Sequence, residues 1–540
     1  MLSLLVFASA LIQVPPPPVE RATLVCAVTA AGTPAVDAEI VVAGRSHRTD
    51  HRGDALIEVA PGVVLVTVSK PGFAPETLTV RAEPGQALTL AVDLQPLPTV
   101  TESVTVSATR TGRGLDDQAM RVEVLDFDEI DEKLMMTPGD VVMMLNEMGG
   151  MRVQATSPSL GAASVRIQGM KGRYTRFLSD GLPLFGERVS LGLMQIPPMD
   201  LGRVEVIKGA TSSLYGAGAI GGVVNLVSRR PGPTTERQVL VNRSTRGATD
   251  VAAWYSAPIS DRWGLTWLGS VNGQRRNDID RDGWADVPRY ERVVVRPRLY
   301  WDNRAGRSLF ATAGGTWEDR IGGTMPGTVL QAIGPYVEAL RTRRGDVGAT
   351  FQTVSGGGVM WTARGSWVTQ HQTHELGETT ERDERDTAFL EITARRAVAR
   401  HTVVAGVAFQ RDRFRPTDLP QFAYLYAVPG VFVQDDVDIA RWLVVSASLR
   451  VDRHNRFGAF ASPQMSGIVR RGLWSSRISF GTGFSAPTPI TEETDAAGLS
   501  RLTVESPLQA ERGRSLSIDL TRRHGPLSAN LNDSKSGRPP

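Results

Sequence analysis

A run of glycines in the chain has the spacing of a cofactor-binding turn. Gly216, Gly218 and Gly221 match the G-x-G-x-x-G pattern that holds a dinucleotide. That fold needs a helix directly after the glycines and an acidic residue about 20 positions further on. Here the β-branched stretch GVVNLVSRRPG follows, and position 241 is a valine. We therefore predict no cofactor, and the glycines instead permit sharp turns and close approach of backbones.

A second group of residues has the spacing of a cation-binding loop. Carboxylates alternate along the stretch that precedes Gly283, as they do in a calcium loop. The twelfth position, which supplies a bidentate glutamate in an EF-hand, is Arg289. An acidic loop in solvent is therefore the favoured interpretation, and calcium binding is the alternative. The calcium candidates are Asp278, Asp280, Asp282 and Asp286.

The sequence contains no arrangement typical of a catalytic centre. Cys26 is the only cysteine, which excludes a disulfide framework and disfavours a thiolate metal site. His371 and His374 precede the charged stretch ETTERDERD, which we interpret as a solvated loop. Lys and Arg total 60 and Asp and Glu total 57, so the charge balance does not indicate a nucleic acid as partner. We predict that the chain is not an enzyme.

The N-terminal part of the chain contains a leader and a small β domain. The apolar stretch MLSLLVFASALIQV predicts a signal peptide over residues 1–14, with a buried first strand or a mis-assigned start codon as the alternative. Short runs of β-forming residues, separated by Gly, Pro and Asp, then predict a β-sandwich over residues 20–96. With Gly53 in a turn and KPGF from Lys70 after a strand, this segment resembles the carboxypeptidase-regulatory-like domain.

A block of short motifs follows in the order typical of one family. PPMDLGRVEVIKG begins at Pro197, and SLYG and GGVVN come after it. Together with RIQG and a DG turn upstream, these motifs resemble the plug domain of TonB-dependent outer-membrane receptors. The plug-motif residues are Arg166, Gly169, Asp180, Gly181, Arg203, Glu205, Gly209, Tyr215, Gly216, Gly221, Gly222 and Asn225.

The remainder of the chain alternates apolar and polar residues in the manner of a transmembrane barrel. The stretches from Trp263 to Val271 and from Leu443 to Val451 each place apolar residues at every second position. GFSAPT and LQAERGRS, further along, are similar to later motifs of the same family. About 14 strands fit into the available length, against about 22 in a plugged transporter barrel. The sequence therefore predicts an incomplete barrel and a truncated gene product.

The predicted fold class is mainly β, with three folded parts. A small β-sandwich is followed by an α+β plug domain and by an antiparallel transmembrane β-barrel with about 14 of about 22 strands present. The predicted domains are a signal peptide over 1–14, the sandwich over 20–96, a TonB-box linker over 97–111, the plug over 112–232 and the incomplete barrel over 235–540.

The resemblance implies a receptor in the cell outer membrane with its N-terminal domain in the periplasm. Its function would be TonB-coupled import of a scarce ligand such as a ferric siderophore, cobalamin or an oligosaccharide. A non-transporting surface-binding protein or an inactive fragment is the alternative. The implied partners are TonB with its inner-membrane energising complex, outer-membrane lipid, and a small ligand such as a metal chelate, with no nucleic acid.

The resemblance also implies roles for individual residues. Pairing with TonB by strand addition would fall on the alternating stretch Val104, Thr105, Val106, Ser107 and Ala108. In the family, plug arginines meet barrel carboxylates and hold the plug in place. The candidates for such ion pairs are Arg166 and Arg203 in the plug and Glu511 and Asp519 in the barrel, with a local pair between Arg203 and Glu205 as the alternative.

Overall fold

The computed structural model divides the chain into two compact units, residues 1–102 and 103–540. It describes residues 21–30, 32–42, 45–70, 73, 76–94, 109–111, 115–157, 159–184, 195–327, 334–524 and 527–537. The predicted signal peptide and the predicted TonB-contact residues 104–108 lie outside these ranges. Among the described residues, no helix has the length and the apolar character needed to cross a membrane.

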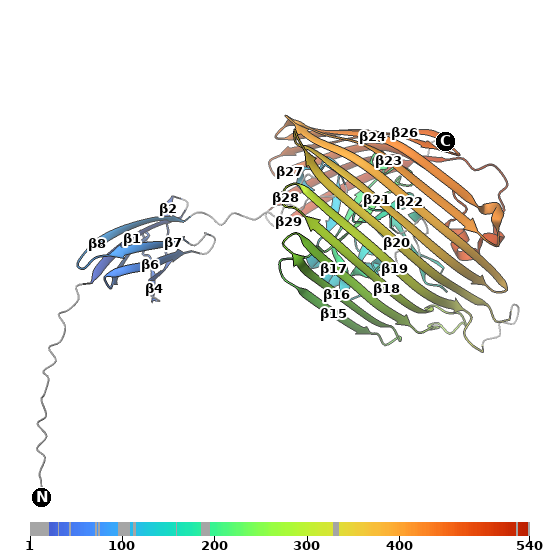
Figure 1. Cartoon of the computed structure of the whole chain (residues 1–540), viewed down its shortest axis with the longest axis horizontal. Coiled ribbons are helices and arrows are strands. Elements are labelled where there is room, and N and C mark those ends of the chain that lie inside the picture. Colours follow the sequence, from blue (N-terminus) through green and yellow to red (C-terminus); the bar gives the residue numbers. More distant parts are fainter. Residues whose placement is uncertain are drawn as a thin grey trace, which may run out of the picture. The chain divides into compact units, whose positions relative to one another are not determined.

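The first unit contains the predicted β-sandwich, drawn in blue in Figure 1. Its strands are β1 (Ala22–Ala30), β2 (Thr33–Pro34), β3 (Glu39–Val42), β4 (Arg45–Arg48), β5 (Asp54–Val59), β6 (Gly62–Ser69), β7 (Glu76–Ala82) and β8 (Ala87–Leu94). One sheet has the order β2-β1-β5 with β8 parallel to β1, and the other has the order β4-β3-β6-β7. Alternate residues of β1, β3 and β5 point inward, and Leu24, Ile40, Ile57 and Val66 meet in one apolar core.

The second unit begins with a small α+β domain, residues 115–228, which we call the inner domain. Its elements are η1 (Leu115–Asp117), β9 (Val122–Leu125), α1 (Phe127–Leu134), α2 (Val142–Asn146), β10 (Met151–Ser157), β11 (Ala162–Ile167), η2 (Gly172–Tyr174), β12 (Thr175–Ser179), η3 (Pro198–Asp200), β13 (Leu201–Lys208), α4 (Ser212–Tyr215) and β14 (Gly222–Ser228). A four-stranded sheet has the order β12-β14-β13-β9, and β10 pairs with β11 as a separate hairpin. Helix α1 begins at Asp126, whose carboxylate accepts the backbone N–H of Glu129.

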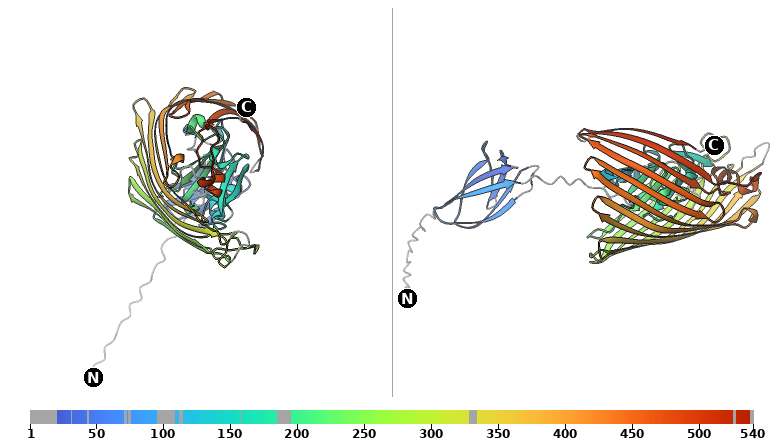
Figure 2. Two further views of the ribbon diagram at one scale, coloured as in Figure 1. Left: turned by 90° about the vertical axis from the view of Figure 1, so that its right-hand side faces the viewer. Right: turned by 90° about the horizontal axis from the view of Figure 1, so that it is seen from above.

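Fifteen antiparallel strands form the rest of the unit, and Figure 2 shows that they curve around the inner domain. We call them the curved sheet. They are β15 (Glu236–Arg243), β16 (Thr249–Ser260), β17 (Trp263–Gln274), β18 (Arg289–Asp302), β19 (Arg307–Gly323), β20 (Val337–Ser355), β21 (Val359–Leu376), β22 (Thr379–Val398), β23 (His401–Pro416), β24 (Tyr424–Ala440), β25 (Leu443–His454), β26 (Gly458–Arg471), β27 (Trp474–Ser485), β28 (Glu511–His524) and β29 (Leu527–Gly537). Each strand pairs with its neighbour in sequence, and within the described residues β15 and β29 each have one partner.

The two ends of the curved sheet differ in their connections. Turns such as 261–262, 399–400 and 441–442 join the strands at one end, which we call the short-turn end. At the other, long-loop end the connections include 275–288 and 486–510, and the latter carries α5 (Glu492–Ala497) and η5 (Leu499–Arg501). A further connection there contains η4 (Pro420–Phe422).

The two faces of the curved sheet separate apolar from polar side chains, as the alternation predicts. Outward positions of β23 and β25 carry exposed apolar residues such as Val407 and Leu449, whereas inward positions carry buried polar residues such as Asp412 and Arg450. Trp263, Trp361, Trp442 and Trp474 are exposed beside the short turns. An apolar outer band edged by aromatic residues is typical of a barrel wall in lipid.

Two local predictions differ from the structure. His374 and the stretch ETTERDERD lie in strands β21 and β22 and not in a solvated loop, because every second polar side chain faces the polar interior of the curved sheet. Thr137 and Pro138, followed by GDVVMMLNEMGG, predict a short helix with Thr137 as its N-cap. The structure has the shorter α2, with Val141 as a cap residue that makes no side-chain bond. The backbone N–H of Val142 is instead satisfied by the carboxylate of Asp140.

Candidate ligand site between the inner domain and the curved sheet

Four of the plug-motif residues form one continuous hydrogen-bonded chain. Arg203 Nε donates to Glu205 at 2.8 Å, and the Asn225 amide donates to the other oxygen of Glu205 at 3.0 Å. The backbone N–H of Gly181 donates to Asn225 Oδ1 at 2.9 Å. Glu205 and Asn225 face each other because they are register partners in β13 and β14, and both are fully buried. Removal of one partner would leave a buried polar group unsatisfied, at a cost of about 1–3 kcal/mol.

Asp180, in the turn after β12, bonds both to the inner domain and to the curved sheet. It lies in the left-handed region with φ 52° and accepts the backbone N–H of Ser228 at 2.9 Å and its hydroxyl at 2.8 Å. The Asp180 carboxylate also lies 3.7 Å from Arg298 on β18, which pairs with Asp200 as well. The DG turn therefore fixes the end of β12 both to β14 and to the curved sheet.

Two of the motif glycines occupy places that no other residue fits. Gly222 has φ 142°, and a Cβ atom there would lie 2.3 Å from the carbonyl oxygen of Ile207. Gly216 has φ 74°, and its Cβ would lie 3.2 Å from the guanidinium of Arg450 on β25. The glycines thus permit the close packing of backbones that the sequence indicates, both within the inner domain and against the curved sheet.

Other motif residues are also buried or in close contact with their neighbours. Tyr215 is buried, and Arg110 lies over its ring at 4.6 Å from the centroid. Burial raises the pKa of Tyr215 to about 12. Gly209 approaches Ser515 of β28, Gly221 approaches the carbonyl of Tyr174, and Gly169 has φ 80° in the turn after β11.

Ion pairs join the inner domain to the curved sheet, but their partners differ from those predicted. Arg166 pairs with Glu492 of α5 at 2.8 Å, and not with Glu511 or Asp519. Arg203 pairs with Glu205 on its own strand, which is the local alternative. The prediction matched motif positions to carboxylates without knowing strand register, and register decides which side chains meet.

The two predicted barrel carboxylates do contact arginines of the inner domain. Glu511 pairs with Arg173 at 3.0 Å, and Asp519 pairs with Arg121. Lys171 pairs with Glu493, whose pKa this hydrogen bond lowers to about 2. Sequence reasoning missed these basic residues, although Lys171, Arg173 and Arg176 form a cluster of positive charge directly after RIQG that could have marked them.

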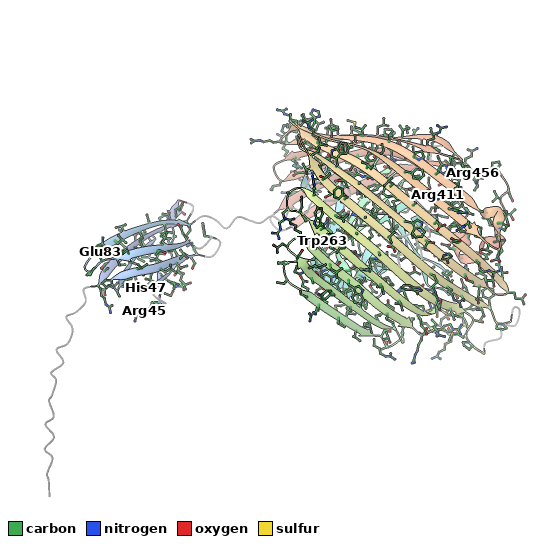
Figure 3. All side chains as sticks on the ribbon, in the orientation of Figure 1. Arg45, His47, Glu83, Trp263, Arg411 and Arg456 are labelled. Carbon is green, nitrogen blue, oxygen red and sulfur yellow. The ribbon has the colours of Figure 1, made fainter. Side chains whose placement is uncertain are left out.

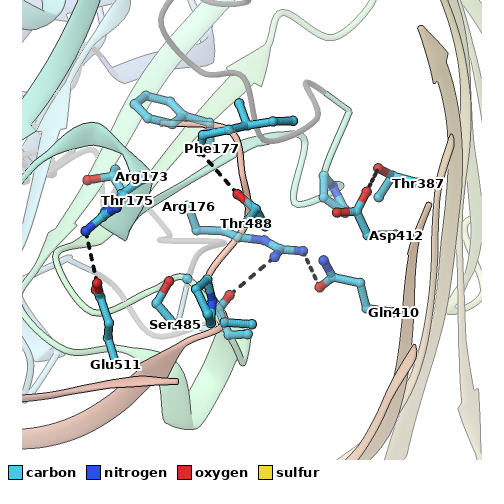
Figure 4. A pocket seen from close by; sticks show the side chains of 16 residues that line it. Arg173, Thr175, Arg176, Phe177, Thr387, Gln410, Asp412, Ser485, Thr488 and Glu511 are labelled. Carbon is cyan, nitrogen blue, oxygen red and sulfur yellow. Dashed lines mark hydrogen bonds and ion pairs between the residues drawn. The ribbon is translucent and has the colours of Figure 1, made fainter. Parts of the chain in front are cut away.

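A pocket of about 100 Å³ lies where this basic cluster faces the wall of the curved sheet. Figure 4 shows Arg173 and Arg176 from the inner domain together with side chains of β22, β23 and the 486–510 connection. Arg176 donates to Gln410 at 2.9 Å, which joins β12 to β23 across the pocket. We call this space the outer pocket, because β23 and β28 contribute residues near the long-loop end.

The wall of the outer pocket is fixed by its own network. Asp412 accepts hydrogen bonds from Arg385 at 2.7 Å, from Tyr424 at 3.0 Å and from Thr387 at 3.1 Å. The side chains of Arg385 and Asp412 are both 4% exposed, so the pair is desolvated. A network of this kind stiffens the wall beside the two inner-domain arginines, which are themselves bonded to Glu511 and Gln410.

A larger cavity of about 1020 Å³ lies at the short-turn end. Its lining includes the turns around Asp261 and Asp302, Asp180 of the inner domain, and Arg110, which precedes that domain. We call this space the inner cavity. The five-residue strand β12 connects the two spaces, since Thr175 and Arg176 line the outer pocket and Asp180, the next residue after its end, lines the inner cavity.

Arg110 anchors the start of the second unit inside the inner cavity. It pairs with Glu391 of β22 at 2.6 Å, and the two side chains are 3% and 1% exposed. Its guanidinium also donates to the carbonyl of Leu214 and lies over the rings of Tyr215 and Phe432. Desolvation lowers the pKa of Arg110, and the charge of Glu391 opposes that shift. Sequence reasoning did not identify this residue.

The acidic loop 275–288 brings together three of the four calcium candidates. Carboxylate oxygens of Asp278, Asp280 and Asp286 lie within 4.8 Å of one another. Several of these oxygens already accept backbone N–H groups of the loop, and Asp282 accepts the N–H of Trp284 at 2.7 Å. The backbone N–H of Asp282 lowers the pKa of Asp280, but desolvation and the neighbouring carboxylates outweigh it and leave that pKa raised.

Comparison with known protein families assigns the inner domain. The TonB-dependent Receptor Plug Domain family matches residues 115–223. The ferrioxamine receptor of Yersinia enterocolitica is 30% identical over 243 residues, which are 45% of this chain and 32% of that protein. The iron-regulated outer membrane virulence protein of Vibrio cholerae is 22% identical over 438 residues, which are 77% of this chain and 64% of that protein. The chain therefore spans less than two thirds of the length of these relatives.

Solved structures share the fold of the second unit. The siderophore receptor PirA of Acinetobacter baumannii has a TM-score of 0.63 at 16% identity, over 77% of this chain and 70% of that one. The siderophore receptor PirA of Pseudomonas aeruginosa has a TM-score of 0.59 at 18% identity, over 77% of this chain and 74% of that one. At such identities the likeness shows the architecture, namely a plug inside a curved antiparallel wall.

Proposed function

Because the chain belongs to the TonB-dependent outer-membrane receptors, we propose that it binds a ferric siderophore and takes part in its TonB-coupled import. The observation that carries this proposal is the outer pocket, which plug arginines and the barrel wall share. Of the relatives named above, one is a ferrioxamine receptor and another is an iron-regulated outer membrane virulence protein. Arginine is suited to an anionic chelate because its guanidinium donates several hydrogen bonds in a fixed geometry.

The direction of transport follows from the ends of the wall. In outer-membrane barrels the short turns face the periplasm and the longer loops face outward. The outer pocket would then receive the ligand, and the inner cavity would open toward the periplasm. The enclosed 100 Å³ is smaller than the about 300–1,000 Å³ of ordinary small-molecule sites. The ligand would therefore rest at the mouth of the pocket until the plug moves.

Strand β12 and Arg110 are the parts of the plug that would transmit this movement. TonB would add a strand to residues 104–108, immediately before Arg110. Tension there acts first on the buried pair between Arg110 and Glu391, and separating such a pair costs about 3–5 kcal/mol. Release of Arg110 from Glu391 and from Tyr215 would free α4, and the movement would reach β12, the strand that connects the two spaces.

The test separates binding from transport. Ferric siderophores of hydroxamate and catecholate type are titrated into the purified full chain, and tryptophan quenching is recorded. Arg176→Ala should weaken binding about ten-fold, since a charge-assisted contact contributes about 1.5–3 kcal/mol. Arg341→Ala is the matched control, because Arg341 lies on the outer face of β20 and is 58% exposed.

Uptake of radioactive iron by iron-starved cells then tests the coupling to TonB. Val106→Pro removes a backbone N–H from the proposed TonB strand, so uptake should be lost while binding is unchanged. Binding without any TonB-dependent uptake would support the alternative function, a surface-binding protein that does not transport. Failure of every ferric chelate to bind would reject the proposed ligand class.

A further inference from the structure

The outer face of the wall carries a group of arginines that the plug and the ligand site do not use. Arg411 and Arg413 lie on β23, Arg453 lies on β25, and Arg456 lies in the turn after it. Their strand neighbours Asp412 and Asp452 are buried inside, so Arg411, Arg413 and Arg453 project from the opposite, outer face. Arg456 is exposed in the adjoining turn, over the ring of Phe457. We call this group the outer arginine patch. Figure 3 labels Arg411 and Arg456 near the long-loop end and Trp263 near the short-turn end.

Within the described residues the arginines of this patch lack acidic partners, unlike several other outward arginines near the long-loop end. Arg289 pairs with Glu291, Arg341 and Arg343 pair with Asp319, Arg382 pairs with Asp418, and Arg415 pairs with Glu384 and Asp386. Among the described residues, no ion pair involves Arg411, Arg413, Arg453 or Arg456. Arg413 lies opposite Asp386 in register, but that carboxylate is bound by Arg415. The positive charge of the patch is therefore not neutralised within the protein.

The height of the patch matches the boundary of the membrane. On β23 the outward residues between His401 and Arg411 are apolar, namely Val403, Ala405, Val407 and Phe409. At about 3.4 Å per residue and a tilt of about 40°, this interval covers about 25 Å along the membrane normal. That distance equals the height of the apolar band of outer-membrane barrels, about 25 Å. Arg411 therefore lies where the acyl chains end and the headgroups of the outer leaflet begin.

An apolar groove lies directly beneath the patch. It has a volume of about 460 Å³ and is lined by Leu390, Ile392, Val407, Phe409, Val431 and Val451, with Arg453 at its margin. The six apolar side chains are between 40% and 56% exposed, so the groove is open to the surroundings of the wall. A groove of this kind beneath an unneutralised cationic rim is complementary to an acyl chain joined to an anionic headgroup.

We propose that the outer arginine patch and the groove below it bind a phosphorylated, acylated lipid of the outer leaflet. The guanidinium groups of Arg411, Arg413 and Arg453 hold the phosphate through charge-assisted hydrogen bonds, and an acyl chain occupies the groove. Arg456, in the turn above, extends the positive surface toward the sugar or glycerol part of the headgroup. The site is separate from the outer pocket, so lipid binding does not depend on the proposed import function.

The experiment is a titration of the detergent-purified full chain with diphosphorylated lipid A, followed by native mass spectrometry. The triple variant Arg411→Gln, Arg413→Gln, Arg453→Gln should lower the apparent affinity at least about ten-fold, because three charge-assisted contacts are lost. Arg341→Gln is the matched control, since Arg341 is an exposed outward arginine that is paired with Asp319, and it should leave the affinity unchanged. Equal affinities of the wild type and the triple variant would overturn the proposal.

Two further arms keep the result decisive if the triple variant folds poorly. Val431→Trp should fill the groove and weaken lipid A binding while all the arginines remain. Rising salt should weaken binding to the wild type, as expected for phosphate contacts at an exposed surface. Inorganic phosphate at the same concentration should not displace the lipid. Displacement by free phosphate, together with full affinity in Val431→Trp, would mean an anion site without a lipid and would reject the proposal.

Discussion

The sandwich and the plug are two small domains of the same chain that use buried groups differently. The sandwich encloses its apolar core between two sheets, and residues such as Leu24 and Ile57 pack within that core. The plug has its own apolar core around Val204 and Val224, but much of its buried surface is polar and faces the wall. Ser213 donates to Gln464, and Gln195 donates to Glu318 at 3.2 Å.

An enclosed apolar core and a polar interface differ in how easily the parts that they join can move apart. An apolar core is stable because water is excluded from it, and separation of its parts costs free energy in proportion to area. Hydrogen bonds and ion pairs across a polar interface can be exchanged for bonds to water, so their net contribution is small. The plug is held by polar contacts, so it can move within the barrel without unfolding the barrel. The sandwich has an enclosed apolar core, so its two sheets stay together.

The largest expected contrast is between the two domains as isolated fragments. Residues 21–94 should fold alone and unfold cooperatively in urea, because their core is complete. Residues 115–228 should give a poorly dispersed amide NMR spectrum, because groups such as Asp200 and Gln195 find partners only on the wall. A well-dispersed spectrum with cooperative unfolding of the second fragment would remove the distinction.

Arg298→Met should loosen the plug more than any other single change described here. It leaves Asp200, whose side chain is 3% exposed, without its cationic partner, and such a loss costs about 3–5 kcal/mol. Hydrogen exchange at β12 and β14 should accelerate, and large antibiotics should leak into cells that carry the variant. Arg289→Met is the control, because its exposed pair with Glu291 contributes about 1 kcal/mol or less. Equal protection of β12 and β14 from hydrogen exchange in both variants would contradict the role given to the pair between Arg298 and Asp200.

Leu24→Ala should destabilise the sandwich without affecting the ligand site. The fully buried side chain leaves a cavity, and the free energy of unfolding should fall by about 2–5 kcal/mol in a urea titration of residues 21–94. Leu56→Ala, at a position 75% exposed on the same sheet, should change it by about 0.5 kcal/mol or less. Siderophore binding by the full chain should be the same in both variants, and a loss of binding in Leu24→Ala would show that the domains are coupled.

The smallest expected effect is the pH dependence of the contact between Lys171 and Glu493. The pKa of Glu493 is lowered to about 2, so the contribution of this pair is complete above its ordinary pKa and is lost as the pH falls toward 2. Because the Glu493 side chain is 64% exposed, the contribution is about 1 kcal/mol or less. In the wild type, the hydrogen exchange of plug amides should change as the pH falls into the acidic range, and Glu493→Gln should reduce that change. Glu505→Gln, at an exposed position, should leave it unchanged. If hydrogen exchange at acidic pH were identical in the wild type and both variants, a role for the Lys171–Glu493 pair would be ruled out.

The parts predictable from the sequence were those set by local pattern. Alternation along β23 and β25 follows from the two environments of a barrel wall, and the motif order around Arg203 and Gly216 indicated the plug. The described residues form 15 strands in the curved sheet, close to the about 14 expected from the length of the sequence. The residues assigned to TonB contact remain a prediction, since they lie outside the described residues.

The partners of charged residues could not be predicted because they depend on strand register and on folding across long stretches of sequence. Arg166 meets Glu492, which is 326 positions away, and Arg110 meets Glu391 at a separation of 281. No local pattern specifies such pairs. The polar strand β22 was interpreted as a loop for a related reason, since hydropathy alone does not separate a polar barrel interior from solvent.

The buried Cys26 in β1 has a practical consequence for spectroscopy. It is the only thiol in the chain, its side chain is inaccessible, and burial raises its pKa, so little of the reactive thiolate is present near neutral pH. A cysteine introduced at an exposed position, for example on the 486–510 connection, would therefore be labelled with a maleimide dye or spin probe in preference to Cys26. Distances between such labels on the plug and the wall can then be followed while a ligand binds, without first removing a native thiol.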